Sequence, residues 1–254
     1  SVLTNNDIVR FRRELQEDGK KATYINSIMF AISRYCEFAV EKGILKSNPV
    51  EDISSLSIPA KGQMEVRWLS TNQQYAFLRE VKARGDSQDM AIMLMLLDVG
   101  LRVSELVGLR GRDVVLNPVD KAFVYVGYSK QDKSRKVPIE SRRLRQALLD
   151  YIREYNPTET EYFFSNGGRS YTTRAIQLKV EKYKKKTDID IEVTPHSLRH
   201  SFCKNKVDAG LRLEEVAVLA GHFTRTGQPN IKAVQIYTTP SLDDIRLKMR
   251  KEGI

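Results

Sequence analysis

Apolar side chains recur at helical spacing in two segments at the start of the chain. The first stripe, over residues 8–15, follows a helix-capping pattern that begins at Thr4. The second stripe, over residues 23–42, is followed by Gly43, a residue type that commonly ends helices. Residues 1–53 are therefore predicted to form a small helical domain.

The helical spacing is interrupted over residues 54–65. This segment is rich in Ser, Pro and Gly and has no periodicity, so it predicts a linker between domains. Helical spacing returns at Ser70. The segment 87–99 is apolar almost all round its predicted helix, and such helices are buried. We expect it to lie at the centre of a second domain over residues 66–254.

The pattern changes again in the middle of the second domain. Three short runs, at 114–116, 123–126 and 136–139, are rich in β-branched or aromatic residues and predict strands. A basic segment, residues 128–135, connects the last two as a hairpin tip. Helical patterns return after residue 141 and continue toward the end. The predicted fold class is mostly α with a small β-sheet, as a helical domain followed by an α+β domain.

Charge and composition narrow the class of protein. The 254 residues carry a net charge of +10, and acidic and basic residues balance over residues 1–60, so the excess lies in the second domain. A basic domain favours a polyanionic partner such as nucleic acid, although some basic proteins bind none. No apolar run reaches the ~18 residues of a membrane span, and the first residues lack the pattern of a signal peptide, so we expect neither. Cys36 and Cys203 are the only cysteines and lack metal-type spacing, which predicts a reducing, cytoplasmic location.

Two short motifs place arginines where an anion is a natural partner. In the segment 194–200, a helix that starts near Pro195 would put His196 and Arg199 on one face. This arrangement suits an anion clamp, but it also suits an ordinary helix start with surface polar residues. Arg102 lies in an apolar turn and also needs an anion, and an internal pair with Glu105 is the simpler alternative.

Taken in order, the motifs identify a family. They are Gly-Leu-Arg-Val-Ser-Glu-Leu, a basic hairpin, Pro-His-Ser-Leu-Arg-His, Leu-Ala-Gly-His and Ile-Tyr-Thr. This order, over most of residues 66–240, resembles the tyrosine recombinase (phage integrase) family, whose core-binding domain the first 53 residues also resemble. The resemblance implies the catalytic residues Arg102, Lys130, His196, Arg199, His222 and Tyr237, with Glu105 and His200 as supporting residues. Lys133 is the alternative to Lys130.

The chemistry implied by the resemblance fits these residue types. Two guanidiniums, Arg102 and Arg199, can bind the non-bridging oxygens of a phosphodiester and stabilise the charge that develops during attack. Tyr237 would attack and form a 3′-phosphotyrosyl bond, with His196 as the proton acceptor. Lys130 would protonate the departing 5′ oxygen. The covalent intermediate stores the energy of the broken bond, so we expect no cofactor and no metal.

The resemblance also implies partners. The two domains of one chain would form a C-shaped clamp around double-stranded DNA. Four chains would form a homotetramer on two sites, with the helix 241–250 docked on a neighbouring subunit or on its own domain. The DNA backbone contacts predicted within the basic segments are Lys133, Arg135, Lys184 and Lys185. For the two lysines, which lie in the run 182–186, a solvated helix end is the alternative. We expect a nucleoid-associated, prokaryotic-type recombinase.

The biological role is open among several alternatives. His222 and Tyr237 are separated by more residues than in Xer-like members of the family, and the extra residues fall in the loop 223–229. This spacing favours service to a mobile element in integration, excision or cointegrate resolution. It also suggests a flexible tyrosine segment. Chromosome dimer resolution by a Xer-type enzyme is the alternative, followed by a type IB topoisomerase and a non-catalytic DNA-binding regulator.

Overall fold

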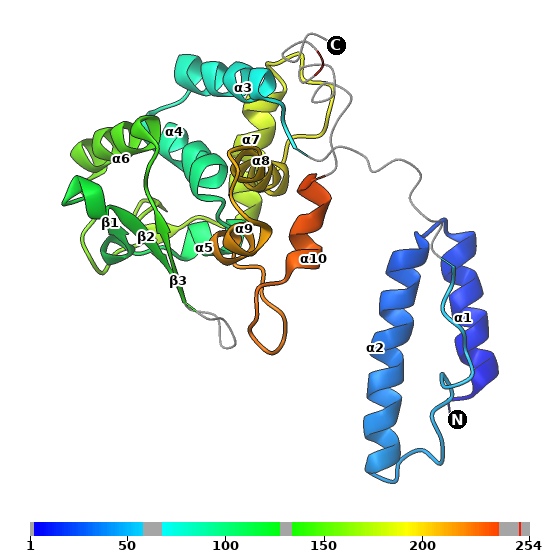
Figure 1. Cartoon of the computed structure of the whole chain (residues 1–254). Coiled ribbons are helices and arrows are strands. Elements are labelled where there is room, and N and C mark those ends of the chain that lie inside the picture. Colours follow the sequence, from blue (N-terminus) through cyan, green and yellow to red (C-terminus); the bar gives the residue numbers. More distant parts are fainter. Residues whose placement is uncertain (1–2, 58–67, 128–133, 239–248, 250–254) are drawn as a thin grey trace. The chain divides into compact units, whose positions relative to one another are not determined.

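The computed structural model describes residues 3–57, 68–127, 134–238 and residue 249, and the chain divides into two compact units (Figure 1). The first unit is Ser1–Glu65 and the second is Val66–Ile254. No helix within the described ranges is long and apolar enough to cross a bilayer. Each unit has its own hydrophobic core.

The first unit is an antiparallel pair of helices, α1 (Asn5–Glu17) and α2 (Ala22–Glu41) (Figure 1). Its small core joins Ile8 of α1 to Ile25 and Cys36 of α2. The predicted linker starts too early, because its first residues belong to this unit. Leu56 exchanges two hydrogen bonds of 2.9 Å with the side chain of Asn26 and is thereby fixed to α2.

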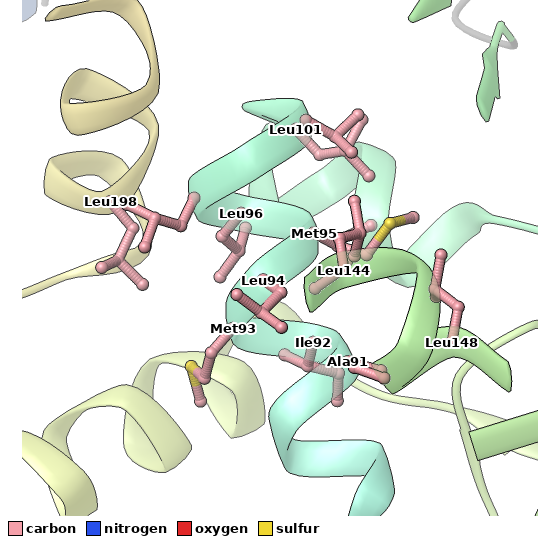
Figure 2. Close-up of a cluster of buried hydrophobic side chains, with 14 of the residues drawn as sticks. Ala91, Ile92, Met93, Leu94, Met95, Leu96, Leu101, Leu144, Leu148 and Leu198 are labelled. Atoms are coloured by element: carbon pink, nitrogen blue, oxygen red, sulfur yellow. The ribbon is translucent and has the colours of Figure 1, made fainter. Parts of the chain in front are cut away.

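The core of the second unit is built around one buried helix. Helix α4 (Ser87–Leu94) runs into a π-helical turn (Met95–Val99), and every residue from 91 to 97 is buried. Figure 2 shows its side chains between Leu144 and Leu148 of α6 (Arg142–Tyr155) on one side and Leu198 on the other. Helix α3 (Thr71–Arg84) also packs on α4. The helix predicted to occupy the core therefore does so.

A three-stranded antiparallel sheet lies at the edge of this helical core. Strands β1 (Val114–Val115), β2 (Phe123–Val126) and β3 (Arg135–Pro138) are in sequence order, with Val124 opposite Val137. A second, two-stranded sheet is formed by β4 (Ser165–Asn166) and β5 (Arg169–Ser170). Short 3₁₀ turns lie at Gly111–Asp113 and Val119–Lys121. The predicted fold class, mostly helical with a small sheet, is confirmed.

Five further helices carry the candidate chemistry. They are α5 (Val103–Gly108), α7 (Thr173–Lys184), α8 (Pro195–Asp208), α9 (Leu213–Ala220) and α10 (Ile231–Val234). The helix predicted over 231–237 is divided, because α10 tightens into a 3₁₀ turn at Gln235–Thr238. The predicted final helix 241–250 lies outside the described residues except for residue 249.

Candidate active site

The start of α8 places a histidine at the surface and an arginine beneath it. Thr194 and Ser197 form a reciprocal cap, with the backbone N–H of Thr194 donating to Ser197 Oγ at 2.7 Å, and Pro195 fills the first turn. His196 is exposed, whereas Arg199, one turn later, is only 3% exposed. The predicted helix start is confirmed, but the arginine is not the surface residue of the simpler alternative.

The buried guanidinium of Arg199 connects three distant segments. One nitrogen donates to the carbonyl oxygen of Gly100 at 2.6 Å and lies 3.8 Å from the carboxylate of Glu105. Another donates to the carbonyl of Ala220 and lies 3.4 Å from His222 Nε2. Arg199 therefore holds the turn before α5, the α5 carboxylate and the end of α9 around one point.

Glu105 is shared by several arginines. Its Oε1 accepts from Arg102 at 2.9 Å, and both of its oxygens accept from Arg135 at 2.9 Å. The internal Arg102–Glu105 pair, the simpler alternative from the sequence, does form. The Arg102 side chain nevertheless remains 40% exposed, so the same guanidinium can also meet an anion from solvent.

The last carbonyls of α9 are satisfied by the same arginines. Leu219 accepts from Arg135 at 2.8 Å, Ala220 from Arg199, and Gly221 from Arg102 at 2.6 Å. Carbonyls at a helix C-terminus have no partner within the helix and form the negative end of its dipole, so guanidiniums are favourable there. Gly221 has φ +66°, a conformation that suits glycine, and His222 follows it directly. The arginine-capped end of α9 thus places His222 at the cluster.

The concentration of positive charge changes the titration of the groups within it. Burial opposes ionisation of Glu105, but hydrogen bonds and charge from Arg135 outweigh it and hold the pKa of Glu105 below its usual value. Burial, and then the charge of Arg102, lower the pKa of Arg199 to about 10, so it stays protonated at neutral pH. Burial, and then Arg199 and Arg102, lower the pKa of His222 to about 4. His222 is therefore neutral near pH 7.

Tyr237 lies in the 3₁₀ turn after α10 and is only 2% exposed. Its hydroxyl is hydrogen-bonded to His200 Nδ1, and its ring meets Trp68 edge-on at 6.0 Å between centroids. Burial, and then the adjacent Cys203, raise the pKa of the hydroxyl. The sequence assigns the proton-acceptor role to His196, but the structure places His200 on the hydroxyl. His196 packs edge-to-face on the His200 ring at 4.1 Å.

The long loop between the third histidine and the tyrosine is closed on itself (Figure 1). Residues 223–229 form a small hairpin in which the N–H of Thr224 donates to the carbonyl of Gln228 at 2.8 Å. The N–H of Asn230 then donates to the carbonyl of His222, also at 2.8 Å. The extra residues therefore leave and return to one point and do not lengthen the path to the tyrosine. These contacts close the loop itself, and the flexibility of the tyrosine segment stays a prediction.

Comparison with protein families decides the assignment. The family model described as "Phage integrase family" matches residues 67–242, which span every group described above. The chain belongs to the phage integrase family. It is a tyrosine recombinase, a site-specific DNA recombinase.

Relatives in sequence agree with this assignment, and solved structures share the fold. The chain is 30% identical over 237 residues to tyrosine recombinase XerC of Haemophilus influenzae, covering 91% of this chain and 75% of that protein. It is 28% identical to tyrosine recombinase XerA of Thermococcus kodakarensis over 256 residues, covering 98% and 82%. The Tn1549 transposon integrase in complex with transposon right end DNA has the same fold, with a TM-score of 0.70 at 20% identity over 99% of this chain and 86% of that one.

In this recombinase, the lysines and the arginine that the sequence predicts to act on DNA or to contact it differ from one another in exposure and in partners. Lys130 and Lys133 lie outside the described residues. Lys184 is half-buried at the end of α7, and Lys185 is exposed and paired with Glu181 at 2.8 Å. The prediction that Arg135 binds DNA is wrong, because its side chain is only 6% exposed and its guanidinium is occupied by Glu105.

Proposed function

We propose that the cluster of Arg102, Arg199 and His222 binds the scissile phosphate of duplex DNA and that Tyr237 attacks it. One observation carries this proposal: the three groups lie together at the end of α9. Arg102 donates to the carbonyl of Gly221, Arg199 donates to that of Ala220, and Arg199 also lies beside His222. The tyrosine is drawn from the next element and is held by α8, the helix that carries Arg199.

The charge balance of the site supports an anionic ligand. Arg102, Arg135 and Arg199 surround the carboxylate of Glu105, so the cluster has an excess of positive charge. Arg135 and Arg199 are buried, and Arg102 is open to solvent. A phosphodiester supplies the missing negative charge, and charge that develops on its oxygens is stabilised most strongly by donors already in place. His222 is neutral in this field and offers a hydrogen bond to the phosphate.

The reaction then follows from the groups at hand. As the Tyr237 oxygen bonds to phosphorus, its proton passes to a nearby base, and His200 Nδ1 is the group in contact with it. The bond from phosphorus to the 5′ oxygen breaks, and that oxygen takes a proton from Lys130, the hairpin lysine. A 5′-hydroxyl attacks the 3′-phosphotyrosyl bond in the reverse sense and releases the tyrosine with its proton.

For the biological role, we favour recombination of a mobile element in the cytoplasm, at the nucleoid. The support is the closed loop 223–229, which sets the chain apart from the shorter Xer-like spacing. One structural neighbour is a lambda integrase tetramer bound to a Holliday junction, and we propose a homotetramer on two sites here, joined by the segment 241–250. Chromosome dimer resolution is the alternative role.

The covalent adduct provides the test. Duplexes that bind the protein are selected from a random pool, rebuilt with a nick in the core, and incubated with the protein before denaturing electrophoresis. We expect an adduct that is absent with Tyr237→Phe and present with Tyr155→Phe, which changes a tyrosine far along the chain. An adduct that persists in Tyr237→Phe contradicts the assignment of the nucleophile.

A second assay separates the reaction classes. A supercoiled plasmid with two copies of the selected site should give recombinant circles. Relaxation without recombinants would point to a topoisomerase, and binding without any adduct to a regulator.

A further inference from the structure

The guanidinium of the buried arginine of β3 is bound within the protein, and its surroundings point to a role inside the site. Building on the proposed function, we propose that Arg135 is a positioning residue for the phosphate site. It fixes the carboxylate of Glu105 and the turn that carries His222, and so sets where Arg102 and Arg199 point.

Each of the three guanidinium nitrogens of Arg135 donates a hydrogen bond. Its two terminal nitrogens donate to the two oxygens of Glu105, each at 2.9 Å, and its Nε donates to the carbonyl of Leu219 at 2.8 Å. A planar guanidinium that binds both carboxylate oxygens fixes the orientation of the carboxylate, which a lysine ammonium cannot do. The Nε hydrogen bond to Leu219 holds the end of α9 against the same guanidinium group.

This orientation matters because Glu105 also faces both phosphate-binding arginines. Arg102 donates to Glu105 at 2.9 Å, and Arg199 lies 3.8 Å away. With Arg135 in place, the carboxylate is directed toward β3, and the Arg199 contact remains long. Without it, the carboxylate would be free to turn toward Arg102 and Arg199 and occupy the N–H groups that a phosphate needs.

The turn beside His222 is shaped around the same guanidinium. A Cβ at Gly221 would lie 2.5 Å from a terminal nitrogen of Arg135, so the backbone of the turn packs directly against the guanidinium. Gly221 also accepts a hydrogen bond from Arg102 on its carbonyl. Arg135 therefore supports the turn from one side while a phosphate-binding arginine holds it from the other.

The position of Arg135 in the sequence extends the role to the hairpin. It is the first residue of β3 and follows Lys130, the proposed proton donor, by five residues. The contacts of Arg135 hold this first residue of β3 at the phosphate site.

The test measures binding and chemistry separately. Arg135→Lys keeps the charge, and Arg143→Lys, which changes a half-exposed arginine paired with Asp98, is the matched control. We expect Arg135→Lys to change the Kd for the selected nicked duplex less than about threefold while the adduct rate at saturating DNA falls roughly ten- to a hundredfold. The control should retain its rate. The folded fraction of each variant, read from Trp68 fluorescence, corrects the rates.

Chemical rescue distinguishes positioning from general stability. In Arg135→Ala, millimolar guanidinium should restore part of the adduct rate, and methylammonium, a point charge, should restore less. An unchanged rate per folded molecule would overturn the proposal. So would a weaker Kd with a salt slope reduced by about one and a normal rate at saturation, which is the result for a surface phosphate contact. Tyr237→Phe, assayed alongside, must give no adduct, and an adduct there refutes the proposed function instead.

Discussion

Replacing Glu105 by Gln tests whether the arginine cluster depends on one carboxylate. The substitution keeps the shape of the side chain but removes its charge and turns one oxygen into an N–H donor. Arg135 and Arg199, whose side chains are 6% and 3% exposed, would then remain buried without an anion. Whichever oxygen is lost, two of its hydrogen bonds go with it, because each oxygen accepts from both Arg102 and Arg135.

The expected loss of stability is large. Removing one partner of a buried ion pair typically costs about 3–5 kcal/mol. Two lost hydrogen bonds to ionised groups, at about 1.5–3 kcal/mol each, give a similar total. The half-exposed Arg102 contributes less because water screens it. We therefore expect Glu105→Gln to lower the free energy of unfolding of the second unit by about 3–5 kcal/mol.

Urea unfolding followed by tryptophan fluorescence measures this loss. Trp68 is the single tryptophan of the chain and packs on Tyr237, so its emission reports the second unit and not the first. Urea is preferred because guanidinium would compete for the carboxylate. Glu181→Gln is the matched control, because it breaks an exposed pair with Lys185 and should cost less than about 1 kcal/mol.

Acidification gives a second reading of the same carboxylate. The pKa of Glu105 is lowered in the folded state, so its contribution is complete above the unfolded value of about 4.3 and is lost as pH falls through the folded value. Glu105→Gln should remove that part of the acid dependence. If Glu105→Gln unfolds within about 1 kcal/mol of the wild type, the cluster does not depend on this carboxylate.

Three further predictions follow from the surroundings of the other site residues. His200→Phe leaves the buried Tyr237 hydroxyl without its partner and should slow adduct formation at saturating DNA about a hundredfold; a normal rate would remove His200 from the reaction. The pKa of His222 is lowered to about 4, so stability should be complete above about pH 6.5 and fall by up to about 3 kcal/mol toward pH 4, and His222→Gln should flatten that slope in urea titrations at stepped pH. Shortening residues 224–228 to a two-residue turn should keep the adduct rate within about threefold, because the hydrogen bond from Asn230 to His222 lies outside the removed segment; a larger loss would show that the loop itself holds the tyrosine.

Local signals explain which elements were predictable. The capping pairs at Thr4, Ser70 and Thr194 act within four residues, and each marks the true start of a helix. Gly100 and Gly221 adopt left-handed conformations at the ends of their helices, where glycine is favoured. Such interactions involve residues that are close together in the sequence, so the order of helices and strands could be inferred without the structure.

Contacts between distant segments explain what was missed. A basic residue beside a turn is usually solvated, and for this reason Arg135 was predicted to contact the DNA backbone. One signal did point the other way. Successive residues of a strand face opposite sides, so Arg135 lies on the same face as the buried Val137, and Lys136 lies on the exposed face. No comparable pattern distinguishes His200 from His196, because the choice depends on where Tyr237 returns after the loop.

Under the proposed function, the arginine cluster also links folding of the catalytic unit to DNA binding. Three guanidiniums share one carboxylate. Burial, and then the charge of the neighbouring arginines, lower the pKa of both Arg199 and His222, so added positive charge is unfavourable there. The positive charges of the cluster are not fully neutralised until an anion binds, and this lowers the free energy of unfolding of the unit. A phosphate that binds only the folded form restores the balance and stabilises it in proportion to its occupancy. Without DNA, the folded site already has the arrangement of donors that is complementary to a phosphodiester, and this is also the state in which the site is least stable. This cost is expected of donors that are arranged before their ligand binds.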